Sequence, residues 1–329
     1  MRIGVFCSGG DAPGMNACTR AVIRSAVPKD HEVIGILRGY QGLLEQDFFH
    51  QPDGEPLMRL RSVSNILQLG GTVLGTSRSA EFRTDEGVKK AAGVLNRHRI
   101  DALIPIGGDG TFHGCVDLAK HWKGQIVGCP GTIDNDLLGT DYTIGFATAV
   151  HTAVEAVDKL RDTAESHERL FLVEVMGRYS GYIALYTALA GGAEVVALPE
   201  SHTDVPSIVK HLKMLKCRGK KSIMVIVAEG DELGGAVALD KGMQEAGCPF
   251  ETRVVLLGHL QRGGSPVPAD RILATRLGDF AVQALDRGAT GVMAGDVRGE
   301  LTLTPFAETY TRHKAVPESL LAVLQTMSS

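Results

Sequence analysis

The chain has 329 residues, which predicts about two domains at roughly 150 residues each and leaves room for a large buried core. Lysine and arginine total 34 and aspartate and glutamate total 38, so the net charge of −4 argues against a broad nucleic-acid-binding surface, which is usually basic. Hydrophobic residues make up 44% and charged residues 22%, a globular balance that argues against disorder. We find no C-x-x-C pair among the six cysteines, no signal peptide and no long apolar run, so the sequence predicts a cytoplasmic protein without a membrane span.

Short apolar runs alternate with helix-length stretches along the chain. The runs are rich in Val and Ile and predict strands at 3–7, 33–37, 102–106, 126–129, 170–175, 195–198, 223–227 and 254–257. The predicted helices are 15–25, 86–98, 111–122, 147–160 and 268–285. Such alternation is typical of an α/β fold with parallel sheets, in which ligands bind at the carboxyl ends of the strands. Residues 48–58 contain two prolines and one glycine without periodicity and predict a surface loop.

Two glycine-rich turns each lie between a predicted strand and a predicted helix. They are residues 8–14 (SGGDAPG) and 107–111 (GGDGT). Glycines there let the backbone approach a phosphate, and the following helix offers free N–H groups. Neither turn matches the P-loop or the dinucleotide fingerprint, so each alone is equally consistent with a simple tight turn.

Asp109 lies between glycines in the second turn. A carboxylate beside a bound phosphate would repel it unless a cation lay between them. Asp109 is therefore a candidate ligand, direct or through water, for Mg²⁺ carried by a nucleotide. The alternative is an ordinary helix N-cap.

A third turn, residues 130–136 (PGTIDND), follows the fourth predicted strand and brings Asp134 and Asp136 close together. In phosphoryl transfer an aspartate can accept the proton of the attacking hydroxyl, while a second carboxylate orients its partner or a metal's water shell. The alternative is a turn in which Asp and Asn bond only their own backbone.

Basic residues lie close to further glycine turns. They are Arg78, Arg83, Arg178, His259 and Arg262. Arginine is well suited to phosphate because its planar group donates two parallel hydrogen bonds. Any one of them could be a solvated surface residue, but several in a net acidic chain favour a polyphosphorylated small molecule as ligand.

The blocks SGGDAPGMNA, IGGDGT, PGTIDND, GTDYTIGF, VEVMGRYSG, ETR and GHLQRGGSPVP occur in this order. With them the chain resembles the bacterial-type ATP-dependent 6-phosphofructokinases over nearly its whole length. The resemblance implies two doubly wound, Rossmann-like domains with the active site in the cleft between them. It implies an ATP-binding domain at 1–145 plus 261–311 and a sugar-phosphate-binding domain at 146–260 plus 312–329. The expected reaction is the glycolytic phosphorylation of D-fructose 6-phosphate at the 1-hydroxyl, which gives fructose 1,6-bisphosphate and ADP.

The resemblance also assigns residues to these roles. The ATP-binding residues would be Gly10, Tyr40, Arg78, Ser79, Gly108, Asp109, Gly110 and Thr111, with Mg²⁺ near Asp109. Asp134 would be the general base, Thr132 and Asp136 would support the transferring phosphoryl group and its metal, and Arg78 would bridge donor and acceptor. The substrate-binding residues would be Thr132, Ile133, Asp134, Arg169, Met176, Gly177, Arg178, Glu229, Arg253, His259, Leu260, Gln261 and Arg262. Arg169 and Arg253 would reach in from a neighbouring subunit, so the resemblance implies a homotetramer.

Donor choice and regulation depend on fewer residues. Relatives that use pyrophosphate carry Asp in place of Gly110 and Lys in place of Gly131, and these larger side chains fill the space of the nucleotide's α-phosphate, so the two glycines favour ATP.

An allosteric effector site would comprise Arg20, Arg24, Arg161, Glu194, Arg218, Lys220 and Lys221. Leu60, Ser222 and Ser79 depart from the family pattern, which leaves the effector open. The spacing of Arg20 and Arg24 also fits a solvated basic helix face.

Several alternatives remain at this point. Within the same chemistry they are another ketose phosphate, such as tagatose 6-phosphate, or pyrophosphate as the donor. NAD kinases and lipid kinases share the GGDG[ST] turn but lack the PGTIDND and GHLQRGGSPVP blocks. A catalytically inactive regulatory subunit would be expected to lack Asp134, Asp109 or Arg78, and all three are present.

Overall fold

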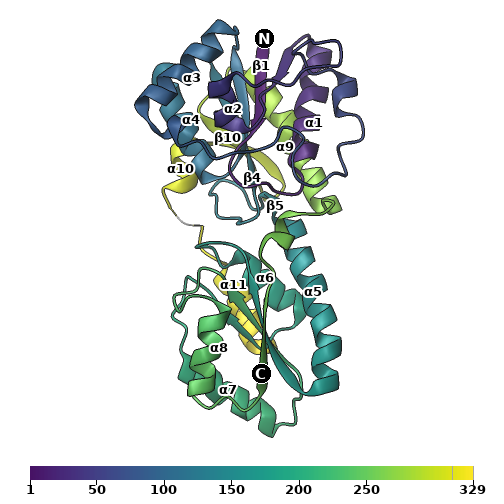
Figure 1. Ribbon diagram of the computed structural model, residues 1–329, viewed down its shortest axis with the longest axis vertical. Helices are drawn as coiled ribbons and strands as arrows, with labels where there is room; N and C mark the ends of the chain where they lie inside the picture. The colour runs from purple at the N-terminus through teal and green to yellow at the C-terminus, as the bar shows by residue number, and fades with distance from the viewer. Residues whose placement is uncertain (313, 329) are drawn as a thin grey trace. The chain divides into compact units, whose positions relative to one another are not determined.

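The computed structural model describes residues 1–312 and 314–328, and the chain divides into two compact units (Figure 1). Unit 1 comprises Met1–Ile133, Leu137–Ala147 and Arg262–His313, and unit 2 comprises Asp134–Asp136, Thr148–Gln261 and Lys314–Ser329. The sequence-based division placed Asp134–Asp136 in the first domain, whereas these residues belong to unit 2. The chain therefore passes between the units more often than the sequence suggests.

Among the described residues, unit 1 is built on a seven-stranded sheet with the order β11-β10-β4-β3-β1-β2, and β5 pairs with β4 off this path. The strands are β1 (Arg2–Cys7), β2 (Glu32–Gly35), β3 (Ala102–Gly107), β4 (Gln125–Thr132), β5 (Ile144–Gly145), β10 (Val292–Val297) and β11 (Glu300–Pro305). All pairs are parallel except β10 with β11. Because parallel strands end at the same edge, the turns that follow β1, β3 and β4 share one edge of this sheet.

Helices cover both faces of this sheet. The helices of unit 1 are α1 (Met15–Ala26), α2 (Gly39–Glu45), α3 (Asp85–Arg97), α4 (Asp109–His121), α9 (Pro268–Asp286) and α10 (Phe306–Tyr310). In Figure 1, α1 and α9 lie on one side of the sheet, and α3, α4 and α10 lie on the other. Local signals set their starts: Thr84 Oγ1 accepts a hydrogen bond from Gly87 N at 3.1 Å to cap α3, and Pro268 opens α9. The aromatic rings of Phe6, Phe112 and Phe306 lie in the core beneath α4 and α10.

Unit 2 has a four-stranded parallel sheet with the order β7-β8-β6-β9. Its elements are α5 (Phe146–His167), which starts in unit 1, β6 (Arg169–Val175), α6 (Tyr182–Gly191), β7 (Val195–Ala197), α7 (Val205–Cys217), β8 (Ile223–Ala228), α8 (Ala236–Glu245), β9 (Glu251–Leu256) and α11 (Glu318–Met327). Leu172 on β6 and Val225 on β8 pack with Leu212 of α7 and Leu239 of α8 in one apolar cluster. Their chain neighbours Val173 and Ile226 are also fully buried, so both faces of the two central strands are covered, as in other parallel sheets.

Each predicted strand and helix occurs, mostly within a few residues of its expected bounds, although the helix predicted at 147–160 extends to His167. The prediction of an α/β protein with doubly wound parallel sheets is confirmed. Strands β5, β10 and β11 were not predicted, because their segments are short or interrupted by polar residues. The segment 48–58 is irregular, as expected, but it does not lie wholly on the surface. Phe48 and Met58 are buried, and isolated bridges join Ile36 to Phe48 and Ile34 to Leu57.

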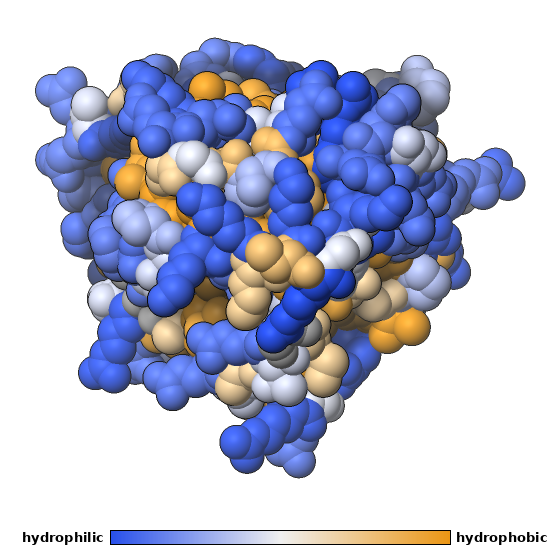
Figure 2. Space-filling view, turned by 90° about the horizontal axis from the view of Figure 1, so that it is seen from below, coloured by the Kyte–Doolittle hydropathy of each residue, from blue (hydrophilic) through white to orange (hydrophobic). Residues whose placement is uncertain are grey.

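Figure 2 shows one face of the molecule, on which hydrophilic residues predominate and hydrophobic atoms occur in small separate groups. Among the residues that the structure describes, no helix has both the length and the apolar character to cross a membrane.

Candidate functional site

The two glycine-rich turns of unit 1 lie side by side at the carboxyl ends of the adjacent strands β1 and β3. The hydroxyl of Thr111 donates to the backbone oxygen of Ser8 at 3.1 Å, and Ser8 N donates to Ile106 O at 3.0 Å. Thr111 is buried, whereas Gly10, Asp109 and Gly110 are exposed. Hydrogen bonds therefore hold the two turns together, and Gly9, Gly10 and Gly110 are exposed while Gly14 and Gly107 are buried.

A third segment, residues 75–79, is attached to the same pair of turns. The hydroxyl of Thr76 donates to Gly9 O at 2.7 Å. Ser79 Oγ accepts from Phe82 N at 3.1 Å, which closes the turn that follows Arg78. Arg78 itself is exposed. The sequence segments predicted to bind ATP thus converge within unit 1.

Tyr40 lies behind these turns and not on their open side. It is 5% exposed, its ring stacks on Phe82 at a centroid distance of 3.8 Å, and its hydroxyl donates to Thr111 O at 2.7 Å. Burial raises the pKa of Tyr40 well above its ordinary value, so the hydroxyl stays neutral. The side chain predicted to lie near the nucleotide is therefore a support for the Thr111 turn.

Arg262 was expected among the sugar-phosphate residues, and it lies against the first glycine turn within unit 1. Its Nη1 donates to Asp11 O at 3.1 Å. A Cβ added to Gly10 would lie 2.2 Å from the same nitrogen, a distance that real Cβ atoms do not reach. Gly10 is thus required for the approach of Arg262.

The two glycines that bear on donor choice differ in their surroundings. A Cβ added to Gly110 would have no atom within 4 Å, so this position opens onto free space. A Cβ added to Gly131 would lie 2.9 Å from both Ile106 Cγ2 and Met15 Cε. A side chain at 131 would therefore have to displace Ile106 or Met15, so glycine there also serves packing, and the argument for space at the nucleotide depends mainly on Gly110.

Asp109 is the first residue of α4, and its Oδ1 accepts from Gly110 N at 2.6 Å. Among residues 1–312 and 314–328 no group of three or more His, Cys, Asp or Glu side chains is placed to hold a metal ion. Protein-bound Mg²⁺ often takes one or two carboxylates and fills its remaining positions with substrate phosphates and water. A single exposed carboxylate beside a glycine-rich turn fits a Mg²⁺ that would arrive with a nucleotide.

In unit 2, two predicted substrate residues, Glu229 and Gln261, support the turn Met176–Arg178 after β6. Glu229 Oε1 accepts from Arg178 N at 2.8 Å and Gly177 N at 3.3 Å, and Gln261 Oε1 accepts from Met176 N at 2.8 Å. Arg178 is exposed and is held at φ +50°, a backbone conformation that non-glycine residues rarely adopt. The Gln261 side chain is fully buried, so it shapes the turn and does not present its amide to a ligand.

The predicted base, Asp134, also belongs to unit 2. Its side chain is buried, and its backbone oxygen accepts a hydrogen bond from Ser180 Oγ at 2.8 Å. The next residue, Asn135, has φ +52°, and its Oδ1 accepts from Lys314 Nζ at 3.2 Å. Asp134 is thus fastened to the loop that carries Arg178.

Thr132 and Ile133 precede the predicted base and remain in unit 1. Thr132 is half-buried, and Ile133 is fully buried. The side chain of Ile133, predicted to contact substrate, therefore belongs to the core.

The two arginines predicted to act across subunits share one carboxylate. Arg169 Nε lies 3.1 Å from Glu251 Oε2, and Arg253 pairs with Glu251 Oε1. Arg169 starts β6 and lies opposite Glu251 in the β6–β9 register. The hydrogen bonds from Arg169 and Arg253 lower the pKa of Glu251. Glu251 was not predicted, although it stands in the ETR block that pointed to Arg253.

The predicted effector residues fall into separate groups. In unit 2, Lys220 Nζ lies 2.5 Å from Glu194 Oε1, whose partner oxygen accepts from Met224 N at 2.7 Å, and Arg161 Nε donates to Gly191 O at 2.8 Å. The remaining predicted effector residues are exposed or half-buried. Arg20 and Arg24 lie on α1 of unit 1, and Arg218 and Lys221 lie in unit 2. Of the positions that depart from the family pattern, Leu60 is exposed and Ser222 is half-buried.

The sequence model of the phosphofructokinase family matches residues 2–285. ATP-dependent 6-phosphofructokinase 1 of Thermus thermophilus is 54% identical over 327 residues and covers 99% of each chain. The chain belongs to the phosphofructokinase family. The ATP-dependent 6-phosphofructokinase of Cytophaga hutchinsonii is also similar, at 45% identity over 99% of this chain and 98% of the relative. The predicted resemblance to bacterial-type ATP-dependent 6-phosphofructokinases is confirmed, and so is the prediction of an enzyme of this family.

Solved phosphofructokinases have the same fold. The phosphofructokinase of Saccharomyces cerevisiae superposes with a TM-score of 0.83 at 34% identity over 99% of this chain. This chain spans about half of that longer one, 47% of its length. A pyrophosphate-dependent phosphofructokinase from Marinobacter aquaeolei gives a TM-score of 0.80 at 22% identity, over 97% of this chain and 86% of that one. At that identity the likeness concerns the fold and says nothing about the donor.

Two further residues that support the loops carrying Arg178 and Arg78 were not predicted. A Cβ on Gly230 would lie 1.6 Å from Arg178 O, so only glycine allows this approach next to Glu229. Asn16 is buried at the start of α1 and bonds the loop that leads to Arg78. The available signals were that Gly230 directly follows Glu229 and that Asn16 lies in the SGGDAPGMNA block.

Proposed function

We propose that this phosphofructokinase-family enzyme transfers the γ-phosphoryl group of MgATP to the 1-hydroxyl of D-fructose 6-phosphate and releases fructose 1,6-bisphosphate and ADP. The similar curated proteins are named ATP-dependent 6-phosphofructokinases. The observation that carries the proposal is the convergence of three predicted ATP-binding segments in unit 1. Thr111 bonds Ser8 and Thr76 bonds Gly9, so the three segments are held as one surface.

In this proposal the turns of unit 1 hold the nucleotide. Backbone N–H groups of the glycine turns and the start of α4 are directed toward its phosphates, where a helix N-terminus favours negative charge. Gly10, Gly108 and Gly110 keep the backbone accessible, and Arg78 and Ser79 contact the nucleotide from the third segment. Asp109 would hold Mg²⁺ directly or through water, and this ion supplies neutralisation of phosphate charge.

Asp134 is proposed as the general base that takes the proton of the 1-hydroxyl as its oxygen attacks the γ-phosphorus. The bond from Ser180 Oγ to Asp134 O supports this role, because it ties the base to the loop proposed to bind the sugar phosphate. Thr132 and Asp136 flank the base and are proposed to orient the transferring group and its metal. Arg78 is proposed to offset the negative charge that develops between donor and acceptor.

The sugar phosphate is proposed to bind the turn Met176–Arg178 with Glu229, His259, Leu260 and Arg262. His259 and Leu260 are exposed in the turn Gly258–Arg262. Arg169 and Arg253 are proposed to act in the site of a neighbouring subunit, and Glu251 keeps both guanidinium groups at one place on the surface of unit 2. A homotetramer follows as the proposed assembly.

An effector site is proposed for Arg20, Arg24, Arg161, Glu194, Arg218, Lys220 and Lys221. Its support is the pairing of Lys220 with the buried carboxylate of Glu194. The proposed location is the cytoplasm, because all six cysteines are free thiols, which suits a reducing compartment.

Donor and acceptor are tested together by initial rates with fructose 6-phosphate and either MgATP or magnesium pyrophosphate at matched concentrations. We expect a measurable rate with MgATP and none with magnesium pyrophosphate, because Gly110 leaves space for the nucleotide. A rate with pyrophosphate would contradict the argument from Gly110. Absence of a rate with either donor, followed by a rate with tagatose 6-phosphate, would move the proposal to another ketose phosphate.

A further inference from the structure

The side chain of Asn16 is buried and bonded at both ends to a single loop. It is 1% exposed in the first turn of α1. Its Nδ2 donates to the backbone oxygens of Leu69 and Gly70, both at 3.1 Å, and its Oδ1 accepts from Val73 N at 2.7 Å. An amide has donors on one end and an acceptor on the other, and Asn16 uses both on the same loop. Such a fully bonded buried amide holds a loop in one position.

This loop continues directly into the segment proposed to bind ATP. After Val73, the buried Leu74 accepts from Arg38 N through its backbone oxygen at 2.8 Å, and Thr76 then bonds Gly9. Arg78 follows in the next turn and is exposed. Hydrogen bonds from Asn16, Arg38 and Thr76 therefore hold the backbone at successive points between Leu69 and Thr76, just before Arg78.

Asn16 also lies next to the glycine turn 8–14. α1 begins directly after Gly14, whose φ of +111° marks the end of that turn. One side chain thus links the turn proposed to hold phosphate with the loop that carries Arg78.

We propose that Asn16 is a positioning residue of phosphoryl transfer, because its amide sets the location of the 69–78 loop and so of the Arg78 guanidinium. The inference rests on the proposed function only for the role of Arg78. Displacements of about 1 Å at a reacting centre can cost about 100-fold in rate. The effect of losing the Asn16 amide is therefore expected in kcat more than in the KM for ATP.

Asn16→Asp and Asn16→Ala test the proposal through their pH profiles. In Asn16→Asp a carboxylate would face the two carbonyl oxygens of Leu69 and Gly70 and repel them, whereas its protonated form would restore one donor. We expect kcat to fall about 10- to 100-fold near pH 8. The kcat of Asn16→Asp relative to that of wild type should recover as the pH falls toward about 6, because burial raises the pKa of such a carboxyl. In Asn16→Ala we expect a similar fall in kcat, and its kcat relative to that of wild type should not depend on pH.

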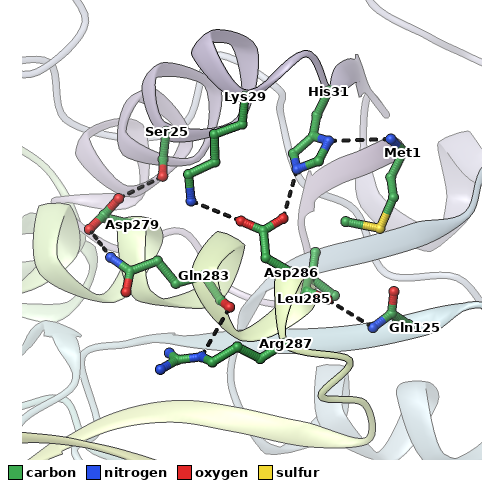
Figure 3. A network of polar contacts seen from close by, with 10 residues as sticks. All are labelled: Met1, Ser25, Lys29, His31, Gln125, Asp279, Gln283, Leu285, Asp286 and Arg287. Carbon is green, nitrogen blue, oxygen red and sulfur yellow. Dashed lines mark hydrogen bonds and ion pairs between the residues drawn. The ribbon is translucent and has the colours of Figure 1, made fainter.

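Gln125 provides a matched control. It is the first residue of β4, at the opposite end of that strand from the turn 130–136. Its Nε2 likewise donates to two backbone oxygens, Leu285 O at 3.1 Å and Ala289 O at 3.3 Å, the first of which is drawn in Figure 3. Gln125→Glu makes the same chemical change away from the proposed site. We expect it to lower stability while kcat and its pH profile stay as in wild type.

Amide hydrogen exchange gives a readout that does not require activity. In Asn16→Ala we expect faster exchange over residues 69–78 and unchanged exchange in β3. A wild-type enzyme without kinase activity would refute the proposed function, yet exchange would still test whether Asn16 holds the loop. The inference is overturned if the wild type is active and Asn16→Ala keeps its kcat, or if exchange over 69–78 is unchanged. Should Asn16→Ala not fold, a pH profile of Asn16→Asp identical to that of Gln125→Glu would equally overturn it.

Discussion

The guanidinium of Arg262 donates to the backbone oxygen of Asp11 at 3.1 Å and lies directly against Gly10. Residues far apart in the sequence therefore meet at the first glycine turn of unit 1. The contact is close because Gly10 has no side chain, and it joins a residue proposed for the sugar phosphate to a turn proposed for ATP.

Gly10→Ala is expected to displace Arg262, because the added Cβ would lie 2.2 Å from Nη1. We expect kcat/KM to fall about 10- to 100-fold, since the Arg262 guanidinium would leave its place beside the turn. Steady-state kinetics with each substrate varied in turn would measure this. Gly93→Ala on α3 is the control, because its Cβ would have no atom within 4 Å, and it should keep wild-type kinetics. Equal kinetics for the two variants would contradict the role of Gly10.

Asp134→Asn is expected to lower kcat by about 100- to 10,000-fold, because an amide cannot accept the proton of the attacking hydroxyl. Binding of MgATP, measured by titration calorimetry, should stay close to wild type, since the proposed nucleotide turns lie in unit 1 and Asp134 lies in unit 2. Asp158→Asn, at an exposed position of α5, should leave both quantities unchanged. Most of the rate remaining in Asp134→Asn would mean that the base lies elsewhere.

Hybrid oligomers test the proposed sharing of sites between subunits. Arg253→Ala and Asp134→Ala are each expected to be inactive, whereas mixed assemblies should regain part of the activity at sites that combine two intact halves. Rates would be measured on hybrids separated by charge tags. Mixtures of Asp134→Ala with Asp134→Asn are the control and should stay inactive. Verified hybrids without recovery would show that Arg253 acts within its own chain.

Asp109→Asn is expected to raise the Mg²⁺ concentration that gives half-maximal rate by about 10-fold, because the proposed protein carboxylate for the ion would be lost. The measurement is the rate against free Mg²⁺ at constant ATP. Asp117→Asn removes an exposed carboxylate from the same helix, α4, where it pairs with Lys120, and should leave the Mg²⁺ dependence unchanged. An unchanged dependence in Asp109→Asn would exclude Asp109 as a ligand, direct or through water.

The polar network of Figure 3 predicts a pH-dependent stability of unit 1. Lys29 Nζ and His31 Nε2 each lie 2.8 Å from Asp286, and Lys29 is the main cause of the lowered pKa of this carboxyl. A lowered carboxyl pKa stabilises the fold above the unfolded value of about 3.9, and this contribution is lost as the pH falls through the folded value. The partners are partly exposed, so Asp286→Asn should cost about 1 kcal/mol or less at neutral pH.

Urea unfolding of wild type and Asp286→Asn would measure this difference at pH 7 and again below the lowered pKa of Asp286, where we expect the two midpoints to converge. Asp279→Asn, on the same helix α9, keeps the contacts of Lys29 and His31 and serves as the control. A difference that persists at low pH would show that the effect is not due to the charge of Asp286.

Much of the fold was predictable because its strands are continuous apolar runs that are buried on both faces. Strand β3 illustrates this, since every residue from Ala102 to Gly107 is buried and its periodicity is unambiguous. Strand β11 was missed because it lies at a sheet edge, where only alternate residues are partly covered and polar residues interrupt the pattern. The buried ends of segment 48–58 were missed for a related reason: single bridges to β2 and to Ile36 leave no periodicity to detect.

Some features of the candidate site could also be predicted from the sequence, and others could not. The glycine turns, Asp109 and Asp134 were identified from the order of residues along the chain, because a glycine-rich turn before a helix and an aspartate in such a turn are local sequence patterns. Burial could not be predicted from these patterns. Tyr40, Ile133 and Gln261 were assigned to ligands, and the structure places their side chains in the interior.

The family, the α/β class and the residue types available for phosphoryl transfer could be predicted from contiguous blocks of residues. Which distant residues meet could be seen only in the folded chain. Folding brought Arg262 to Gly10, Glu251 to Arg169 and Arg253, and Asn16 to the 69–73 loop. A buried polar group needs a hydrogen-bond partner, and a close approach of the backbone needs a glycine. The residues that meet these two needs can lie far apart in the sequence, so their positions along the chain do not reveal them.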